Sequence, residues 1–450
     1  MAPIAPGPRG HFLVGSLPEL RRAPAEFLRE AQAEFGDVVR FSFGGKVAHL
    51  VSSPAGIRHV LQANSRNYTK NTPGIRRLKA ILGEGLITSD GDFWRRQRRT
   101  MQPAFHRDRL QGFADLIDHH AEALCAGWRA AAARGEAVDA HRDMMALTLT
   151  IVGEALFGAD VAADAPTVAR SLETLLRVQD ARFTQAIPLP DWLPTPENRR
   201  FDRAKAALDE VCMRMVRSRR GSPSASRGDL LSMLLEARDP ETGEGMSDAQ
   251  LLDEVVTTFV AGHETTANAL AFSLQLLGSH PAELEKLQQA VAEKFPEEVR
   301  CREAFRWGPV ARVVSESMRL YPPAWLFARS PVEDDTIDGF AIPGGSFVFV
   351  SAWVVHRKPA LWPNPDAFDP DRFAGDAPDR FAFFPYSGGP RQCIGSAFAD
   401  MELHAILSRI AQQFSWRAID PMPPIDPKVT LRPGGPTRLE LRTRPPGRLG

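Results

Sequence analysis

A cysteine placed for anion chemistry lies near the C-terminal end of the chain, in the stretch YSGGPRQCIG. Most free cysteines are small buried hydrophobes, but the two glycines before Cys393 let the backbone come close to a flat ligand, and the proline stiffens the turn. The residues that follow, IGSAFADMELHAILSRIAQQF, have the pattern of a helix, and a helix N-terminus favours thiolate over thiol. Because no histidine base stands beside it, we interpret the Cys393 thiolate as a metal ligand rather than a nucleophile.

The same stretch resembles the haem-binding loop of the cytochrome P-450 family, written F-x-x-G-x-R-x-C-x-G, with Gly389, Arg391, Cys393 and Gly395 in register. The resemblance implies that Cys393 is the axial thiolate ligand of the iron of haem b. It also implies that Arg391 pairs with a haem propionate and that Gly395 borders the haem. Tyr386 stands where the family usually has Phe. It should fill the same space beside the cysteine sulfur, but its hydroxyl needs a partner, which bears on the tuning of the iron potential.

One long helix is predicted from SDAQLLDEVVTTFVAGHETTANALAFSLQLLGSHP. Ser247 and Gln250 have the spacing of a capping box, and Pro281 ends the pattern. A helix of about 30 residues is roughly 45 Å long.

The middle of this helix reads AGHETT, which contains residues that weaken a helix. A solvated turn is the ordinary explanation, but Ala261 and Thr265 share one face among apolar neighbours, so the turn is expected to be buried. The motif matches the family's A-G-x-E/D-T. The resemblance implies an oxygen-binding groove beside the haem, lined by Ala261 and Gly262, in which Thr265 and Glu264 supply protons to dioxygen.

Two kinds of zinc site are excluded by spacing. His263 and Glu264 could begin the HExxH motif of zinc proteases, but Ala267 stands where the second histidine is needed. The four cysteines lie far apart and include no CxxC pair, so neither a cysteine zinc site nor a disulfide framework is predicted.

A third family motif, E-x-x-R, matches Glu316 and Arg319 in VVSESMRLYPP. Such a pair is most often a routine surface ion pair. The segment PDRF matches the family segment whose arginine, here Arg372, completes the network. By resemblance, these three residues hold the cysteine loop in place and take no part in the chemistry.

Four further residues are predicted to contact the haem propionates. GDFWRRQRR resembles the family's W-x-x-x-R helix, which puts Trp94 and Arg98 on one helix face. Arg329 and His356 stand where the family places two other propionate contacts. The resemblance assigns all four to haem binding.

The substrate pocket is predicted by resemblance alone. Ile87, in GLITSDG, belongs to a loop that overhangs the haem in the family, and Ala324, Trp325 and Leu326 follow the E-x-x-R helix. With Ala261, these residues are expected to contact a lipophilic small molecule. The sequence leaves the identity of that molecule, the site of its oxidation and the oligomeric state open.

Composition excludes some classes of protein. The chain has 450 residues, 43% of them hydrophobic and 24% charged, with a formal net charge of zero, so it lacks the basic excess of a nucleic-acid-binding protein. The N-terminal stretch MAPIAPGPRGHFLVGSLPELRR has only a short apolar run, too short for a signal peptide or a membrane anchor. A cytoplasmic location is therefore expected.

The predicted fold is mainly α with a small β subdomain, the cytochrome P-450 fold, in a single haem-thiolate domain spanning residues 1–450. DVVRFSFGGKVAHLVSS alternates around Gly44-Gly45 as a hairpin does, and a closing hairpin is expected around Pro433-Gly434-Gly435. The sheet-rich pieces are expected near residues 37–53, 341–352 and 428–443.

The resemblance implies a soluble, bacterial-type monooxygenase that hydroxylates or epoxidises its substrate with O2 and two electrons. With no flavin or iron–sulfur domain expected in the chain, NAD(P)H acts only indirectly, through a ferredoxin or flavodoxin and its reductase. We expect an acidic partner to dock on the remaining arginines of GDFWRRQRR, namely Arg95, Arg96 and Arg99. Two alternatives stay open: a haem-thiolate isomerase or peroxygenase, whose known members commonly lose the acid–threonine pair, and a non-catalytic haem sensor.

Overall fold

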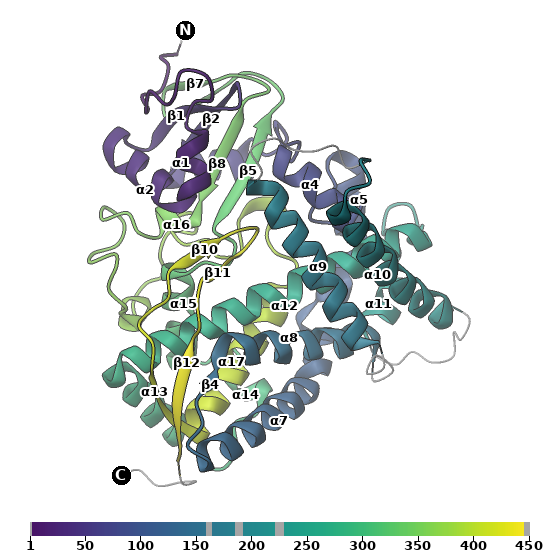
Figure 1. The fold of residues 1–450 in the computed structure, drawn as a ribbon, viewed down its shortest axis with the longest axis vertical. Helices are drawn as coiled ribbons and strands as arrows, with labels where there is room; N and C mark the ends of the chain where they lie inside the picture. Colours follow the sequence, from purple (N-terminus) through teal and green to yellow (C-terminus); the bar gives the residue numbers. More distant parts are fainter. Residues whose placement is uncertain (1, 159–163, 185–191, 221–228, 445–450) are drawn as a thin grey trace. The chain divides into compact units, whose positions relative to one another are not determined.

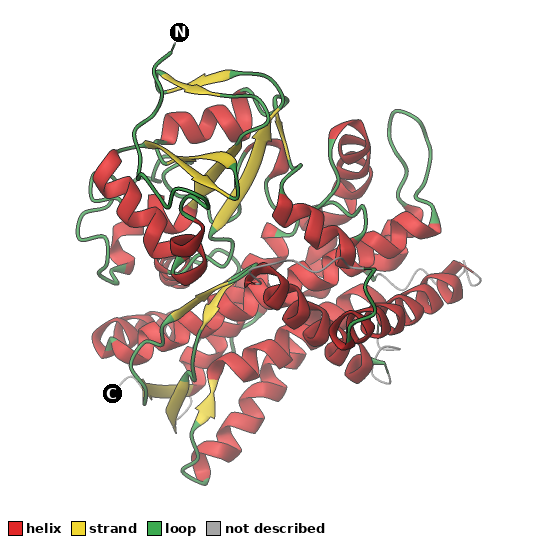
Figure 2. Ribbon diagram, turned by 45° about the horizontal axis from the view of Figure 1, so that its top comes forward, coloured by secondary structure: helices red, strands yellow, loops and turns green. Residues whose placement is uncertain are grey.

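The computed structural model describes residues 2–158, 164–184, 192–220 and 229–444. Most of this part of the chain is helical, and its strands form a few small sheets (Figures 1 and 2). The mainly α class with small β elements is therefore confirmed. The α-helices are α1 (Leu17–Arg22), α2 (Pro24–Phe35), α3 (Pro54–Arg58), α4 (Pro73–Leu82), α5 (Gly91–Met101), α6 (Arg107–Leu110), α7 (Ala114–Ala133), α8 (Ala140–Phe157), α9 (Ala165–Thr184), α10 (Pro196–Arg220), α11 (Leu230–Glu236), α12 (Asp248–Ser279), α13 (Pro281–Lys294), α14 (Cys301–Ala304), α15 (Gly308–Leu320), α16 (Ala352–Val355) and α17 (Ser396–Gln413).

The strands lie in each of the three sheet-rich pieces and in several places besides. They are β1 (Val38–Phe43), β2 (Lys46–Val51), β3 (Tyr68–Thr69), β4 (Val138–Asp139), β5 (Leu326–Pro331), β6 (Asp335–Ile337), β7 (Phe340–Ile342), β8 (Phe347–Ser351), β9 (Phe414–Ala418), β10 (Ile425–Pro427), β11 (Leu431–Pro433) and β12 (Arg438–Thr443). Short π- or 3₁₀-helical turns include η1 (His59–Ala63), η2 (Gln102–Phe105), η3 (Gln111–Phe113), η5 (Pro370–Phe373) and η6 (Gly389–Arg391).

The chain divides into two compact units, each assembled from separate stretches of sequence. Unit 1 consists of Met1–Ile75, Arg312–Ile394 and Ile425–Gly434. Unit 2 consists of Arg76–Ala311, Gly395–Pro424 and Gly435–Gly450. Because the chain passes repeatedly from one unit to the other, it cannot be cut once to separate them, and the single-domain prediction stays a prediction.

Unit 1 is built on a five-stranded sheet with the order β1-β2-β8-β5-β3 (Figure 1). The predicted hairpin is present: Phe43 pairs with Lys46, and Gly44 and Gly45 turn the chain with φ of 55° and 75°. A two-residue turn with positive φ at both positions suits glycine, because a side chain there would be strained. The parallel pairing of β2 with β8 then joins the N-terminal hairpin to the segment that follows the E-x-x-R helix.

The closing hairpin predicted around Pro433-Gly434-Gly435 is wrong. Strand β11 pairs with β10, in register Ile425↔Pro433, whereas β12 pairs with β4 and β9. Proline has no backbone N–H to continue a ladder, so β11 stops at Pro433. The two glycines then lead the chain out of unit 1 and into unit 2.

Unit 2 is organised around α12, which packs against α8, α10 and α17. The capping box is present: the Ser247 side chain accepts from the Gln250 backbone N–H, and the Gln250 side chain accepts from the Ser247 N–H. The helix ends at Ser279, two residues before Pro281, so the prediction of one long helix is confirmed. Its 32 residues correspond to a length of about 48 Å.

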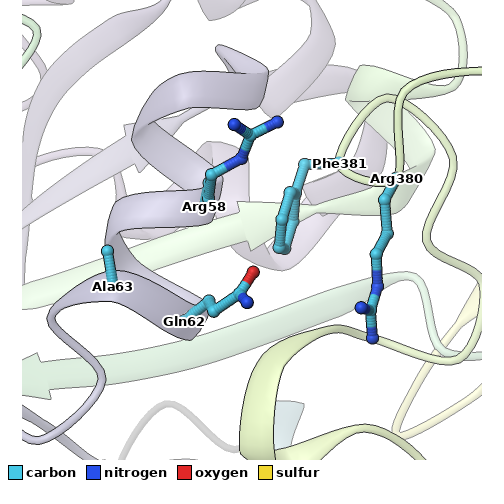
Figure 3. Close-up of a pocket in the computed structure, with 5 residues that line it drawn as sticks. All are labelled: Arg58, Gln62, Ala63, Arg380 and Phe381. Atoms are coloured by element: carbon cyan, nitrogen blue, oxygen red, sulfur yellow. The ribbon is translucent and has the colours of Figure 1, made fainter.

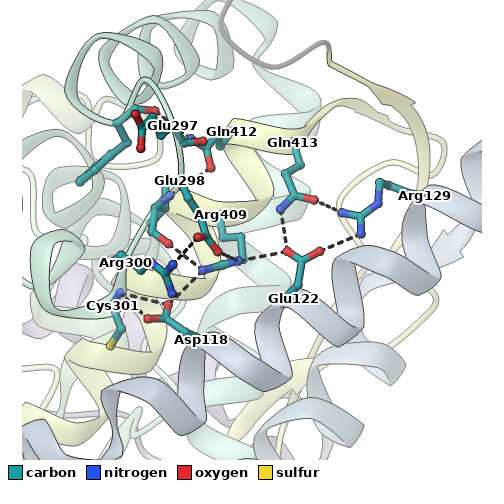
Figure 4. Close-up of polar contacts among 12 residues, drawn as sticks. Asp118, Glu122, Arg129, Glu297, Glu298, Arg300, Cys301, Arg409, Gln412 and Gln413 are labelled. Carbon is teal, nitrogen blue, oxygen red and sulfur yellow. Dashed lines mark hydrogen bonds and ion pairs between the residues drawn. The ribbon is translucent and has the colours of Figure 1, made fainter.

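A buried arginine joins three elements of unit 2 (Figure 4). Arg409 of α17 donates to Asp118 of α7 at 3.2 Å, and to Glu122 and Glu298 at 3.0 Å each. Asp118 also accepts the backbone N–H of Cys301, at 3.0 Å. Removing one partner of a buried ion pair usually destabilises a protein by about 3–5 kcal/mol, so this network is a main tie between α7, α14 and α17.

Among the described residues, none of the helices combines the length and the hydrophobicity that a membrane span requires. The cytoplasmic location stays a prediction from the sequence.

In unit 1, Glu316, Arg319 and Arg372 meet in one buried network. Arg319 donates to both carboxylate oxygens of Glu316, at 2.6 and 2.8 Å, and neither side chain is exposed to solvent. Arg372 donates to the same carboxylate at 3.1 Å. The remaining Arg319 donors bind the carbonyl oxygens of His356, Pro365 and Ala367. The motif thus fixes the course of the chain that leads toward the cysteine loop.

His356 connects this network to the cysteine loop. Its carbonyl accepts from Arg319, and its Nε2 accepts the backbone N–H of Phe384 at 3.1 Å. The ring is fully buried, and it packs against Phe383 and Phe384 with ring centroids 5.2 and 5.1 Å away. Burial lowers the pKa of His356 to about 3, helped by the charges of Arg319 and Arg357. Because Nε2 accepts from Phe384, the proton of the neutral ring lies on Nδ1. The role of His356 as a propionate contact stays a prediction.

We predict that His356 makes the stability of the protein fall in acid. Its folded-state pKa lies below the ordinary value, so between about pH 6.5 and 3 only the unfolded chain takes up the proton. In that range each pH unit should cost up to about 1.4 kcal/mol relative to His356→Gln, which keeps an acceptor for Phe384 but cannot titrate. The measurement is the thermal midpoint of both proteins from pH 7 to 4.5.

The control is His106→Gln, which removes a histidine from the surface without touching the network. A constant difference in midpoint between wild type and His356→Gln at every pH would show that the ring does not resist protonation.

Candidate functional site

Cys393 is the one exposed cysteine of the four. Cys125, Cys212 and Cys301 are buried, and burial raises the pKa of each thiol to about 12. A metal binds the thiolate, so these three thiols are poor ligands. The cysteine that the sequence singled out is therefore the only one of the four in an environment that permits ligation.

The loop before Cys393 is held close to η1, within unit 1. Gly389 has φ of 68°, and a Cβ on it would lie 1.9 Å from the Leu61 carbonyl oxygen. A Cβ on Gly388 would lie 2.7 Å from the Phe381 ring. The Cys393 N–H donates to the Tyr386 carbonyl at 3.0 Å, which closes the turn. The glycines therefore serve to pack this loop against its neighbours, and the thiol is left facing outward.

The helix after the cysteine begins slightly later than predicted. Its first residue is Ser396 and its N-cap is Gly395, so Cys393 precedes the first helical turn. Arg391 and Tyr386 are both partly buried in the loop. A soft sulfur ligand on an ordered, glycine-shaped loop fits a haem iron.

The predicted propionate contacts are divided between the units. Arg391 and Arg329 belong to unit 1, where Arg329 is buried on β5 and donates to the Ala328 carbonyl at 2.9 Å. Trp94 and Arg98 belong to unit 2, one turn apart on α5, with the Trp94 ring buried. Each of these side chains can donate a hydrogen bond to a carboxylate, as the prediction requires.

The basic residues expected to dock a redox partner all have acidic partners in unit 2. Arg95 pairs with Asp92, and Arg96 pairs with Glu244 at 3.0 Å. Arg99 binds both Asp239 and Glu241, at 2.8 and 2.7 Å. Because carboxylates balance these charges, Arg95, Arg96 and Arg99 should attract an acidic protein only weakly.

In α12, the Thr265 hydroxyl donates to the Ala261 carbonyl at 2.8 Å. This is the local back-bond that threonine commonly makes inside a helix. A hydroxyl that has committed its proton in this way can still accept a hydrogen bond. Ala261 and Thr265 are partly exposed, whereas Glu264 is buried at 5% exposure, so the predicted burial holds for the acid and only partly for the threonine.

Gly262 and His263 face α8. A Cβ on Gly262 would lie 2.9 Å from the Val152 side chain, so this glycine permits close packing of the two helices. The Thr148 hydroxyl donates to the His263 carbonyl at 2.9 Å, and burial lowers the pKa of the His263 ring. Packing between α8 and α12 thus explains the glycine that weakens the helix, a reason the sequence did not reveal.

The predicted substrate contacts other than Ala261 differ in their surroundings. Ile87 in unit 2, and Ala324 and Leu326 in unit 1, are partly exposed. Trp325 is 4% exposed, and its Nε1 donates to the Lys428 carbonyl at 3.0 Å. That contact ties the chain after the E-x-x-R helix to the β10–β11 hairpin, which is a structural role for Trp325.

Two buried acids escaped the sequence analysis. Glu402 of α17 is 1% exposed, and burial raises its pKa well above the usual range, an effect only partly offset by the Thr266 hydroxyl. Glu254 of α12 is fully buried beside the loop that contains Ile87. In both cases the signal was an acid followed by apolar residues inside a helical pattern, with a second acid one or two positions before it, in DMELHAIL and LLDEVV.

Comparisons with known proteins agree on one family. The model of the family described as Cytochrome P-450 matches residues 5–440. The cyclooctatin synthase of Streptomyces melanosporofaciens is 38% identical over 97% of this chain and 94% of its own length. The pentalenene oxygenase of Streptomyces avermitilis is 31% identical over 97% and 96%.

Solved structures agree on the fold. The crystal structure of the cytochrome P-450DA heme domain superposes with a TM-score of 0.88, at 27% identity, over 99% of both chains. The match extends through the cysteine loop, the E-x-x-R helix and α12, all of which lie inside the matched region. The chain therefore belongs to the cytochrome P-450 family of haem-thiolate oxidoreductases.

Proposed function

We propose that this protein is a monooxygenase that hydroxylates or epoxidises a lipophilic terpenoid with electrons from a separate redox protein. The observation that carries the proposal is the exposed Cys393 thiol on a loop held by the buried Glu316–Arg319 network. For hydroxylation the balance is RH + O2 + 2e⁻ + 2H⁺ → ROH + H2O. NAD(P)H is the source of the electrons and is oxidised by the reductase of the redox partner.

The proposed haem contacts are the residues that the sequence predicted. Cys393 would be the axial ligand, and Tyr386 and Gly395 would border the haem on that side. Ala261 and Gly262 would border it on the α12 side. The proposed donors for the propionates are Arg391, Arg329, Trp94 and Arg98, with His356 as the fifth predicted contact. When bound, a haem with a thiolate ligand supplies the activation of dioxygen and the transfer of one oxygen atom to carbon.

Thr265 and Glu264 would deliver the protons that the reaction consumes. The Thr265 hydroxyl donates to the Ala261 carbonyl, so toward the haem side it would act as an acceptor that orders a water or an incoming O–H group. Glu264, at 5% exposure, is the nearest acid in the sequence and would feed protons to that site. The acid–threonine pair argues for oxygen activation over the isomerase, peroxygenase and sensor alternatives.

The substrate class rests on the relatives. One of them, from Streptomyces melanosporofaciens, is a cyclooctat-9-en-7-ol 5-monooxygenase, 36% identical over 90% of this chain and 88% of its own. That name describes an unsaturated carbocyclic alcohol. Ile87, Ala324 and Leu326 are apolar and partly exposed, as contacts for such a molecule should be. We infer that the substrate is a polycyclic terpenoid and that Trp325, through its bond to the Lys428 carbonyl, supports the chain between Ala324 and Leu326.

Electrons would enter near the cysteine loop, at a hollow of unit 1 lined by Arg58, Gln62, Ala63, Arg380 and Phe381 (Figure 3). Arg380 makes no ion pair with any carboxylate of the described residues; it donates to Gln392, the residue before Cys393, at 2.6 Å. Arg58 shares its charge with Asp379. The cationic side chain of Arg380 suits a small acidic electron-transfer protein, such as a ferredoxin or flavodoxin.

The first prediction tests the ligand. Cys393→His should still bind haem but lose the red-shifted ferrous carbon monoxide band, because that band requires a thiolate ligand. The measurement is the difference spectrum of the reduced protein with carbon monoxide. The control is Cys301→Ala, which removes a buried cysteine of α14 and should keep the band. If the band persists in Cys393→His, Cys393 is not the ligand.

The second prediction concerns protons. Thr265→Ala should bind haem and substrate and accept electrons, yet release hydrogen peroxide, so product formed per NAD(P)H should fall by up to about 100-fold. Thr150→Ala is the matched control, since Thr150 makes the same back-bond, to Ala146 at 2.9 Å, on an exposed face of α8. If Thr265→Ala forms as much product per NAD(P)H as wild type, Thr265 has no role in proton delivery.

The third prediction concerns electron entry. Arg380→Glu should slow the reduction of the haem by an acidic ferredoxin by about tenfold or more at low salt, with the difference shrinking as salt rises. Arg95→Glu is the control, because Arg95 is already paired with Asp92. Reduction by dithionite should be the same in all three proteins. If Arg380→Glu is reduced by the ferredoxin as fast as wild type, the partner docks elsewhere.

A further inference from the structure

The loop of residues 83–89 lies directly on the first half of α12. Gly83 has φ of 55°, and a Cβ on it would lie 2.0 Å from the Asp253 carboxylate. A Cβ on Gly85 would lie 2.0 Å from the Thr257 hydroxyl. Glycine at both positions therefore lets the backbone touch side chains of α12 with no side chain between. Both elements belong to unit 2.

Two neighbouring acids of α12 hold this loop by its backbone. Asp253 accepts the Glu84 N–H at 2.8 Å, and Glu254 accepts the Leu86 N–H at 3.1 Å. On the other side of the loop, Gln97 of α5 donates to the Glu84 carbonyl at 2.8 Å. The next residue after Leu86 is Ile87, so these bonds determine where its side chain starts.

Glu254 is an unusual choice for this bond. The residue is fully buried, and its second carboxylate oxygen, Oε1, has no hydrogen-bond partner among the described residues. Burial raises the pKa of Glu254 to about 8, with a further rise from the charge of Asp253 and a partial offset from the Leu86 N–H. At neutral pH the carboxyl is thus mostly protonated, and a glutamine could make the same bond without an ionisable group.

We propose that Glu254 is a positioning residue, whose carboxyl holds the Leu86–Ile87 backbone on α12 while neutral and releases it when ionised, so that it controls substrate orientation and affinity. The part about substrate rests on the proposed function, through Ile87. The part about the loop rests only on the contacts of unit 2.

The direction of the pH effect follows from the difference in the pKa of Glu254 between the closed and the lifted loop. With the loop closed, the carboxylate form of Glu254 is disfavoured by burial; with the loop lifted, water reaches the carboxylate and its pKa returns toward the ordinary value of 4.5. Raising the pH toward 8 therefore favours the lifted loop, by up to about tenfold per pH unit. Above that pH the effect levels off, because the carboxyl is ionised in both states.

Other charged groups also lie near this contact. Asp253 is the charged neighbour on α12, and burial raises its pKa as well. From the loop, Glu84 is paired with Lys79, and from α10, Lys205 and Asp209 form an ion pair beside Asp253. Asp253 is therefore the group whose titration must be separated from that of Glu254.

Amide hydrogen exchange of residues 83–89 in the haem-loaded protein without substrate tests the loop. In wild type, protection corrected for the intrinsic exchange rate should fall as pH rises from 6 to 8; in Glu254→Gln it should stay constant. Asp253→Asn, the control for the neighbouring acid, should retain the wild-type pH dependence. The same dependence in Glu254→Gln as in wild type, or its loss in Asp253→Asn alone, would overturn the proposal.

The substrate part is tested by ligand titration, followed by the spin-state shift of the haem, and by product ratios. Wild type should bind more weakly at pH 8 than at pH 6.5, whereas Glu254→Gln should bind equally at both. Glu254→Leu, which leaves Leu86 without its acceptor, should change the product ratio at either pH. If the exchange result is as expected but substrate affinities and product ratios do not change, Glu254 stabilises the loop without affecting the substrate. If wild type oxidises nothing, the proposed function fails while the exchange result still stands.

Discussion

The ion pair between Glu316 and Arg319 is the interaction on which the rest of the site depends. Two charges are fully removed from water, which is unfavourable unless every donor and acceptor is used. Here the arginine also binds the carbonyl oxygens of His356, Pro365 and Ala367, and the carboxylate also accepts from Arg372 and from the Asp369 N–H. These hydrogen bonds offset the loss of water around the pair, and they hold the surrounding loop segments in place.

One consequence is a continuous path of contacts from α15 to the cysteine loop. The His356 carbonyl accepts a hydrogen bond from Arg319, and the His356 ring accepts one from the Phe384 N–H. Phe384 begins the loop that ends at Cys393. On the other side, Gly389 packs against the Leu61 carbonyl of η1. A thiolate ligand must be held in one orientation to bind a metal firmly, and these contacts supply that constraint within one compact unit.

The sequence predicted what depends on local spacing and missed what depends on distant partners. The Glu316–Arg319 pair and the capping box at Ser247 are local patterns, and each has the geometry that its spacing implies. The helix after Cys393 was also predicted, but it begins only at Ser396. The partner of Arg96 is 148 residues away, so its neutralisation could not be foreseen. The same holds for the contact between Gly262 and Val152, and for the burial of His356. The closing hairpin failed because proximity in sequence was taken for pairing.

The central claim is that this chain transfers one atom of dioxygen to its substrate, and labelled oxygen tests it most directly. The purified protein would be supplied with a ferredoxin, its reductase, NAD(P)H and a polycyclic terpenoid alcohol under ¹⁸O2. Mass spectrometry of the product should show one labelled oxygen atom, with the second atom in water. A product that carries unlabelled oxygen, or that forms equally well without dioxygen, would contradict the account.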